Sequence, residues 1–343
     1  MAHASNPPAL TFLTALRNGA AFTLALAAIC AAINAGLPSL PVLGITDKLD
    51  YLRAHRDEID TVFIGSSRVY HAFDPAHFER ETAARGEPLR AFNFGIDGMR
   101  PPESLYVLRE MLKLRLRLRW VFIELAEVQT KVNAANVQSA RAVHWHDLPH
   151  TLLVLRQLAG SAGGSAESWR QARVHAVSFC ARLSNLGRGP EWLGAKLRGP
   201  QKVWRVGLPW EGTRGFEAQR SPQLSGPARA IYEAAVTHLE STPMARVPVP
   251  PLLGSALREI VQEVRATGAQ PVFVISPTVV ARENLADLAA VGIDAPVIAF
   301  TDPRRHPAIF RAENHCDEQH LNARGAAEFT RALAEEWAGL SAR

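Results

Sequence analysis

The chain has 343 residues, of which 47% are apolar and 21% are charged, a balance that allows a large core and excludes a globally disordered protein. The formal net charge is +5, but the basic residues are scattered along the chain and no nucleic-acid-binding motif accompanies them. We therefore interpret the densest basic stretch, 113–119, as a solvated surface, and we expect no nucleic-acid partner.

The first apolar segment is 20–37, eighteen residues without a charge that follow Arg17. Its length is at the lower limit for crossing a bilayer, and no Ala-x-Ala cleavage site is evident. We predict an N-terminal tail over 1–19 and an uncleaved transmembrane signal anchor over 20–37. With Arg17 in the cytoplasm, the rest of this single-pass membrane protein would be periplasmic, although Lys48 and Arg53 weaken the charge asymmetry. The alternative is a buried Ala-rich helix of a soluble protein.

Beyond residue 45, strands alternate with helices, which predicts an α/β domain over 45–343 with a doubly wound parallel sheet. Short apolar runs bounded by turn residues indicate buried strands, which we expect at 61–64, 91–95, 120–125, 271–275 and 296–300. Apolar residues at helical spacing indicate helices at 47–60, 78–85, 101–112, 252–266, 282–291 and 322–337.

Residues 130–250 interrupt this alternation. They hold five of the seven tryptophans and much of the glycine and proline, with helical spacing over 152–158, 169–186 and 228–239. We interpret the segment as a mostly helical insertion or lid with long loops. Its tryptophans fit core or interface positions better than a platform for sugars.

Ser67 lies just after the first strand, in the sequence Gly65-Ser66-Ser67-Arg68. Right-handed crossovers put the carboxyl ends of all parallel strands at one edge of the sheet, where α/β proteins bind ligands. If a helix follows, Ser67 also lies at its N-terminus, where free N–H groups favour developing negative charge. Ser67 is therefore a candidate nucleophile, and the alternative is that it only caps the helix. Ser66 is expected to be structural.

A serine nucleophile needs a base, and the loop before the last helix supplies His320 with Asp317 three residues earlier. The Asp317 carboxylate can fold back to the far nitrogen of the imidazole and orient it. The N–H groups of Ser67 and Gly98 are candidates for the oxyanion hole, because glycine lets the backbone approach a substrate closely. The alternatives are that His320 is an ordinary surface histidine and that Asp317 caps the last helix.

Three short blocks of sequence resemble those of the SGNH/GDSL hydrolase superfamily. Residues 65–67 (Gly-Ser-Ser) are similar to the Gly-Asp-Ser block, 93–98 (Asn-Phe-Gly-Ile-Asp-Gly) to the second block, and 317–322 (Asp-Glu-Gln-His-Leu-Asn) to the final Asp-x-x-His block. The resemblance covers 61–125 and 268–338, and it implies a flavodoxin-like sheet of the SGNH hydrolase type. The site that it implies consists of a catalytic Ser67, His320 and Asp317 and an oxyanion hole at Ser67 and Gly98. Apart from the resemblance, Asn93 and Arg68 are candidates for substrate contacts. For Arg68, an ion pair within the protein is the alternative.

The third block departs from the family's pattern. Its usual Gly-x-Asn, whose Asn side chain completes the oxyanion hole, is replaced by Glu-Leu-Ala-Glu-Val-Gln over 124–129. The hole could then consist of two N–H groups, or Gln129 or an insertion residue could substitute. With the N-terminal anchor, the Gly-Ser-Ser block also resembles the membrane-anchored branch that acts on cell-envelope polymers, such as the D-alanine transfer protein of teichoic acid synthesis and the alginate acetylation proteins. That branch implies a polysaccharide substrate and a membrane acyltransferase partner.

Three histidines in the insertion, His144, His146 and His150, are close enough in sequence to suggest metal ligands, but they show no clear helix register. The three cysteines of the chain form no Cys-x-x-Cys pair. We therefore expect no metal site and no organic cofactor.

These features predict a membrane-anchored serine esterase or O-acyltransferase that acts on an acylated carbohydrate or another cell-envelope ester. The main alternative is a non-catalytic, membrane-tethered scaffold with this fold in a polysaccharide acylation or export complex. The departure in the third block and the long insertion favour that alternative. A third interpretation is a cytoplasmic soluble esterase whose N-terminal helix is part of the core.

Overall fold

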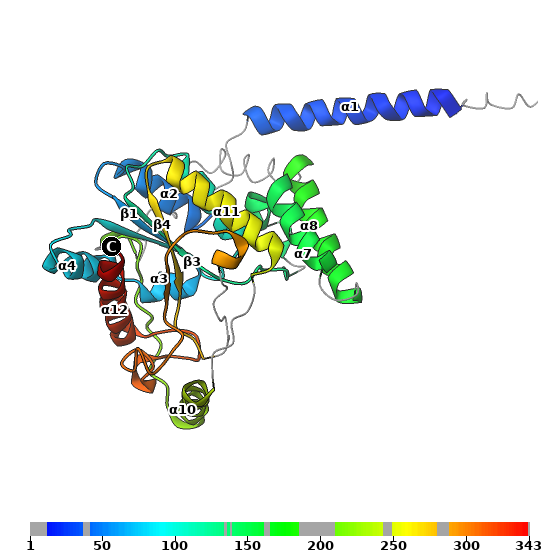
Figure 1. The fold of residues 1–343 in the computed structure, drawn as a ribbon. Coiled ribbons are helices and arrows are strands. Elements are labelled where there is room, and N and C mark those ends of the chain that lie inside the picture. The colour runs from blue at the N-terminus through cyan, green and yellow to red at the C-terminus, as the bar shows by residue number, and fades with distance from the viewer. Residues whose placement is uncertain are drawn as a thin grey trace, which may run out of the picture.

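A computed structural model describes residues 12–36, 42–133, 136–137, 139–160, 165–184, 210–242, 249–279 and 288–341. Its centre is a five-stranded sheet in which all neighbouring strands are parallel (Figure 1). The strands are β1 Thr61–Gly65, β2 Ala91–Gly95, β3 Trp120–Glu124, β4 Gln270–Ile275 and β5 Val297–Ala299. The five predicted strands are confirmed, because no strand end differs from its prediction by more than one residue.

The strand order is β2-β1-β3-β4-β5, which is the order of flavodoxin-like sheets. Successive strands are added on one side of β1 and then on the other, so a switch point lies between β1 and β3. Open α/β sheets bind ligands at the carboxyl ends of the strands at this point. Ser67 follows β1 and Glu124 ends β3, so both residues lie at the switch point.

Helices cover both faces of the sheet, because each strand presents apolar side chains to both sides. One core cluster packs against α2 Ile45–Ala54, α5 Glu103–Leu112 and α11 Pro251–Ala266. The other packs against α3 Ser67–Ala72, α4 Pro75–Ala84 and α12 Ala323–Ser341. The predicted helix at 47–60 ends earlier than expected, at Ala54. Most of the predicted helix at 282–291 lies outside the described residues. The last three residues of that range form the short 3-10 helix η4, Ala289–Val291.

The segment between β3 and α11 is helical in its described parts, as predicted. Its elements are α6 Ala140–Trp145, α7 Leu148–Gly160, α8 Ala166–Ser184, η3 Glu211–Thr213 and α10 Gly226–Ser241. Helices α6, α7 and α8 pack together beside the sheet, and α7 contacts α11 (Figure 1). Helix α10 lies apart from them and contacts η5 Ala312–Asn314, in the loop that leads to His320. The insertion therefore reaches the carboxyl edge of the sheet from two sides.

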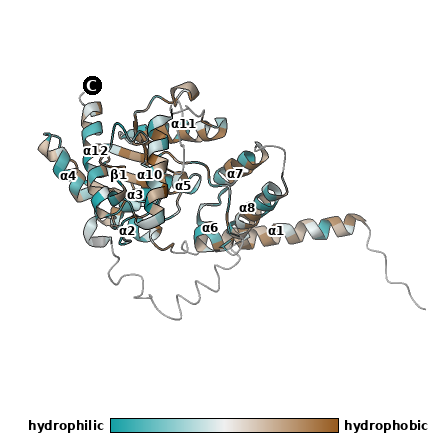
Figure 2. Cartoon of the chain, turned by 90° about the horizontal axis from the view of Figure 1, so that it is seen from below, coloured by the Kyte–Doolittle hydropathy of each residue, from teal (hydrophilic) through white to brown (hydrophobic). Residues whose placement is uncertain are grey.

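Helix α1, Phe12–Gly36, extends away from the rest of the molecule (Figure 1). It is largely apolar along its length, and none of its residues is buried (Figure 2). It is long and apolar enough to cross a membrane. It begins eight residues before the predicted start at 20. Its C-terminal end contacts α8, where Asn34 Nδ2 donates to the carbonyl oxygen of Leu183 at 3.2 Å.

Candidate active site

Ser67 lies at the first position of α3, in a tight turn between β1 and that helix. Ser66 is the N-cap residue, and its Oγ accepts a hydrogen bond from the Arg68 N–H at 3.2 Å. The alternative that Ser67 caps the helix is therefore wrong, and the structural role expected for Ser66 is confirmed. Because Ser66 does the capping, the Ser67 hydroxyl is available for another contact.

That contact is with His320, 253 residues later in the chain. Ser67 Oγ lies 2.8 Å from His320 Nε2, and His320 Nδ1 lies 2.8 Å from Asp317 Oδ2. The Asp317 carboxylate can only accept, so Nδ1 carries the proton of the neutral imidazole. The lone pair of Nε2 then faces the Ser67 hydroxyl, which is the arrangement that a general base requires. The structure therefore brings the three predicted catalytic residues into one chain of hydrogen bonds.

Asp317 is held by its own turn, although its side chain is 55% exposed. Its Oδ1 accepts the N–H of Gln319 at 2.7 Å and the N–H of His320 at 2.8 Å. Partial burial raises the pKa of Asp317, but these hydrogen bonds and the one with the His320 side chain outweigh it and hold the pKa below its usual value. The last helix is capped instead by Asn322, whose Oδ1 accepts the N–H groups of Arg324 and Gly325. The alternative that Asp317 caps the last helix is therefore wrong.

A buried carboxylate, Glu124, lies beneath the turn that carries Ser67. Its side chain is 1% exposed, and its Oε1 lies 2.8 Å from Arg68 Nε. Its Oε2 accepts the Ser66 N–H at 2.6 Å, and its Oε1 also accepts the Ser276 hydroxyl at 3.2 Å. One carboxylate at the end of β3 thus binds the residues on both sides of Ser67 and restrains the turn.

Two residues that were predicted to contact substrate are part of this internal framework. Arg68 is 5% exposed and pairs with Glu124, so the ion-pair alternative is correct for this residue. Asn93 is fully buried, and its Nδ2 donates to the carbonyl oxygens of Val69 and Phe73 at 2.8 and 2.7 Å. Its Oδ1 accepts the Gly95 N–H at 2.7 Å. Asn93 therefore joins β2 to α3, and substrate cannot reach its amide.

Gly95 ends β2 and is packed directly against the backbone of α3. A Cβ at this position would collide with the backbone N and Cα of Tyr70, which have no room to move aside. We expect Gly95→Ala to lower the free energy of unfolding by at least about 2 kcal/mol and to impair any activity of Ser67, because α3 must shift. Gly160→Ala is the matched control, since a Cβ there meets nothing within 4 Å. Urea unfolding of the full chain in detergent measures both, and equal stability of the two variants would contradict the prediction.

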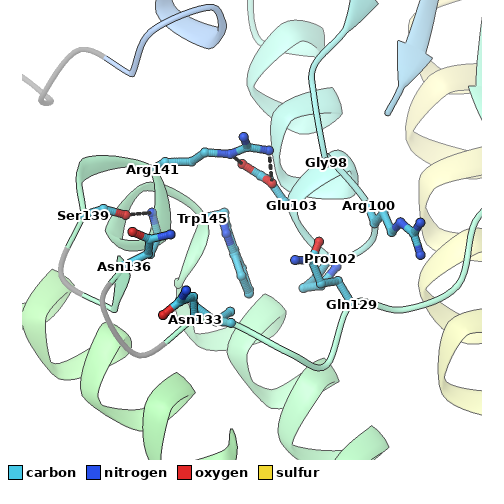
Figure 3. A pocket seen from close by; sticks show the side chains of 12 residues that line it. Gly98, Arg100, Pro102, Glu103, Gln129, Asn133, Asn136, Ser139, Arg141 and Trp145 are labelled. Carbon is cyan, nitrogen blue, oxygen red and sulfur yellow. Dashed lines mark hydrogen bonds and ion pairs between the residues drawn. The ribbon is translucent and has the colours of Figure 1, made fainter. Parts of the chain in front are cut away.

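Gly98, the predicted second oxyanion donor, lies in the turn after β2 with a φ of +68°. The N–H groups of Ser67 and Gly98 have no hydrogen-bond partner within the described residues, so each remains able to donate to a ligand. Ser67, His71 and His320 line a narrow surface crevice that encloses no space for a water molecule. Gly98 lines a larger cavity of about 230 Å³ together with Gln129 (Figure 3). The oxyanion role of the two N–H groups stays a prediction.

The larger cavity is lined by polar and apolar surface in similar amounts. Figure 3 shows the amide of Asn133 and the indole of Trp145 in its wall, near Arg141, which forms an ion pair with Glu103 at 2.7 Å. The remaining lining residues are Gly98, Arg100, Pro102, Gln129, Val132, Asn136, Ser139 and Ala142. The cavity therefore joins the turn after β2 to the insertion, which supplies most of its wall.

The insertion histidines take part in separate contacts. His146 Nε2 lies 2.9 Å from His175 Nδ1, whereas His150 contacts Asp147 at 2.6 Å. Burial lowers the pKa of His146 to about 3, so it is neutral near pH 7. Within the described residues, no group of three or more His, Cys, Asp or Glu side chains could hold a metal ion.

No protein-family model and no curated protein sequence matches the chain. The SGNH/GDSL resemblance therefore remains a prediction from the three short blocks of sequence. What the structure adds is geometric, since residues from the first and last of those blocks meet at one edge of the sheet.

Sequence reasoning missed Glu124 and the pair formed by His71 and Asp97. A signal for Glu124 was present, because an acidic residue ends an otherwise apolar strand and a basic residue follows Ser67 directly. Buried charges are normally paired, so the two could have been matched. No comparable signal marks His71, whose contact with Asp97 arises only because β1 and β2 are neighbours.

Proposed function

We propose that the protein is a membrane-anchored, serine-dependent ester hydrolase or O-acyltransferase of the SGNH/GDSL type. The observation that carries this proposal is the chain of hydrogen bonds from Ser67 through His320 to Asp317. The position of Ser67 at the switch point of a parallel sheet supports it. Helix α1 supports an anchor in the cell membrane, and we place the globular domain in the periplasm.

The proposed reaction has two acyl transfers. Ser67 Oγ attacks the acyl carbonyl carbon of the substrate while its proton moves to His320 Nε2, and Asp317 stabilises the imidazolium. The N–H groups of Ser67 and Gly98 donate to the oxyanion. When the ester C–O bond breaks, His320 returns the proton to the departing alcohol and the acyl group stays on Ser67. Water or a second hydroxyl group then attacks the carbonyl carbon of the acyl-serine and gives its proton to His320. His320 passes this proton to Ser67 Oγ when the acyl group leaves, which regenerates the free serine.

The side chains of the larger cavity suit an ester substrate whose alcohol portion is a carbohydrate. Its wall offers the amides of Gln129, Asn133 and Asn136, which can hydrogen-bond sugar hydroxyl groups. The indole of Trp145 adds an apolar edge, and Arg100 adds a guanidinium. We therefore propose an acylated carbohydrate of the cell envelope as substrate, with a membrane acyltransferase as the partner that supplies or receives the acyl group.

The test is covalent labelling of the full chain in detergent with a fluorophosphonate probe, which reacts with activated serines. We expect labelling of the wild type and none of Ser67→Ala, with Ser255→Ala, an exposed serine on α11, labelled like the wild type. If the folded wild-type protein does not react with the probe, the proposal of an enzyme is contradicted and the scaffold interpretation is favoured. For a reactive protein, an acetylated oligosaccharide separates the two activities: free acetate indicates hydrolysis, and acetyl groups on a second sugar indicate transfer.

A further inference from the structure

His71 and Asp97 contact each other at the carboxyl edge of the sheet, next to the crevice that Ser67 lines. His71 belongs to α3, four residues after Ser67, and it lines the same crevice. Asp97 lies in the turn after β2, directly before Gly98. The Nε2 atom of His71 is 3.2 Å from Asp97 Oδ1. The contact therefore joins the helix that carries the candidate nucleophile to the turn that carries the second predicted oxyanion donor.

The hydrogen-bond partners of His71 show which protonation state this contact needs. Nδ1 lies 2.6 Å from the backbone oxygen of Glu217, which can only accept, so Nδ1 must carry a proton. A neutral ring would then direct the lone pair of Nε2 at the Asp97 carboxylate, and two acceptors would face each other. Only the imidazolium form of His71 donates to both partners.

We propose that His71 and Asp97 form a proton-dependent tether that positions the Gly98 turn beside Ser67, so that ester turnover falls when His71 loses its second proton. The inference rests on the proposed function, because Gly98 acts as an oxyanion donor only if Ser67 is the nucleophile. His71 and Asp97 are positioning residues that act through Gly98.

The backbone of the same turn has a second tether that keeps its charge. Arg141 Nη1 donates to the carbonyl oxygen of Asp97 at 2.8 Å, and the same guanidinium pairs with Glu103. Arginine stays protonated throughout the working range of an enzyme, so this contact does not depend on pH. Loss of the His71 contact would therefore loosen the turn on one side and would not release it.

Charged groups from all the surrounding elements act on this pair. Burial lowers the pKa of His71, but the hydrogen bonds with Asp97 and with the Glu217 backbone, and the charges of both carboxylates, outweigh it and raise the pKa above its usual value. His71 itself, with His320 and Arg141, holds the pKa of Asp97 below its usual range against the effect of burial.

Two further groups lie close to the pair. Burial lowers the pKa of Lys48 on α2 well below its usual range, although Asp97 and Glu217 oppose that shift. The Nζ of Lys48 donates to the carbonyl oxygen of Gly95, two residues before Asp97, at 2.8 Å. The Tyr70 hydroxyl donates to Glu217 Oε2 at 2.7 Å and stays protonated, because burial and that carboxylate raise its pKa. The tether therefore forms in the pH range above the lowered pKa of Asp97 and below the raised pKa of His71, where both groups are charged. It is lost as the pH rises through the pKa of His71.

The experiment compares wild type, Asp97→Ala and Asp97→Asn as full chains in detergent, with p-nitrophenyl acetate as the substrate. For the wild type we expect kcat/KM to fall with the loss of one proton on the alkaline side. Asp97→Ala removes the tether, so we expect a rate about tenfold to a hundredfold lower without this alkaline fall. Asp97→Asn separates charge from contact, because its amide N–H can donate to the neutral ring. It should keep its rate at alkaline pH.

A second readout does not require turnover. We expect the imidazole NMR signal of His71 to titrate above about pH 6.5 in the wild type and lower in Asp97→Asn, and the Gly98 amide signal to follow the same titration. His77→Asn, on the next helix, should change neither curve. The proposed tether would be wrong if the Gly98 amide signal did not change as His71 titrates. It would also be wrong if kcat/KM had the same pH profile in wild type and Asp97→Ala. If the signals move together but no ester is turned over, the proposed function fails and the tether stands.

Discussion

Alanine at Ser67 or at His320 is expected to lower kcat/KM for ester hydrolysis by about 10⁴-fold or more, because each change removes a partner of the first proton transfer. The loss should appear in kcat, since the Ser67–His320 contact serves the transition state and not substrate binding. Asp317→Ala should cost less, about 10²- to 10³-fold, because water can replace part of a carboxylate that is 55% exposed.

The double variant Ser67→Ala with His320→Ala distinguishes a catalytic unit from two independent sites. If the residues act together, it should be no slower than the slower single variant. The measurement is initial-rate kinetics on the full chain in detergent, with His77→Ala as the control for histidine removal. Effects that multiply, or a Ser67→Ala enzyme at the wild-type rate, would show that the hydrogen-bonded chain is not the catalytic centre.

Glu124→Ala is expected to destabilise the fold by about 3–5 kcal/mol, because it removes a buried carboxylate that pairs with a buried guanidinium. Arg68 and Glu124 have side chains that are 4% and 1% exposed, so water does not replace the lost partner. The Ser66 N–H also loses its acceptor. We further expect labelling of Ser67 to slow by about a hundredfold in the fraction that remains folded, since the turn loses the contacts that restrain it.

Glu127→Ala is the matched control for this change. Glu127 has the same chemistry three residues later but is exposed, so its removal should change the free energy of unfolding by no more than about 0.5 kcal/mol. Urea unfolding of both variants, followed by probe labelling at low urea, separates lost stability from lost reactivity. If Glu124→Ala unfolds at the same urea concentration as Glu127→Ala, the ion pair does not have the role that its burial indicates.

The catalytic candidates could be predicted from the sequence because each depends on a local pattern. An apolar run that ends at Gly65 specifies a buried strand, so Ser67 had to follow at its carboxyl end. Asp317 and His320 share one short turn, and their contact needs no distant partner. The handedness of βαβ connections then places Ser67 and the loop of His320 at the same edge of the sheet. Their contact could therefore be predicted although the two residues are 253 positions apart.

Roles that depend on long-range partners could not be predicted in the same way. Arg68 and Asn93 lie inside the motifs and have side chains that suit substrate binding, yet both are buried. The carboxylate that pairs with Arg68 comes from β3, and the carbonyl groups that Asn93 binds come from α3. Neither partner lies within the motif of the residue that it binds, and only Glu124, as an acidic residue that ends an apolar strand, carried a signal of its own.

The sequence by itself thus determined the strands, most of the helices, the apolar N-terminal helix and the three residues of the hydrogen-bonded chain, Ser67, His320 and Asp317. Only the tertiary structure decided which polar side chains face a ligand and which hold the site together, as Glu124 and His71 do. The physical reason is that a buried polar group must be paired. Its partner is chosen by the packing of strands and helices that are distant in sequence, whereas strands and turns are specified by neighbouring residues.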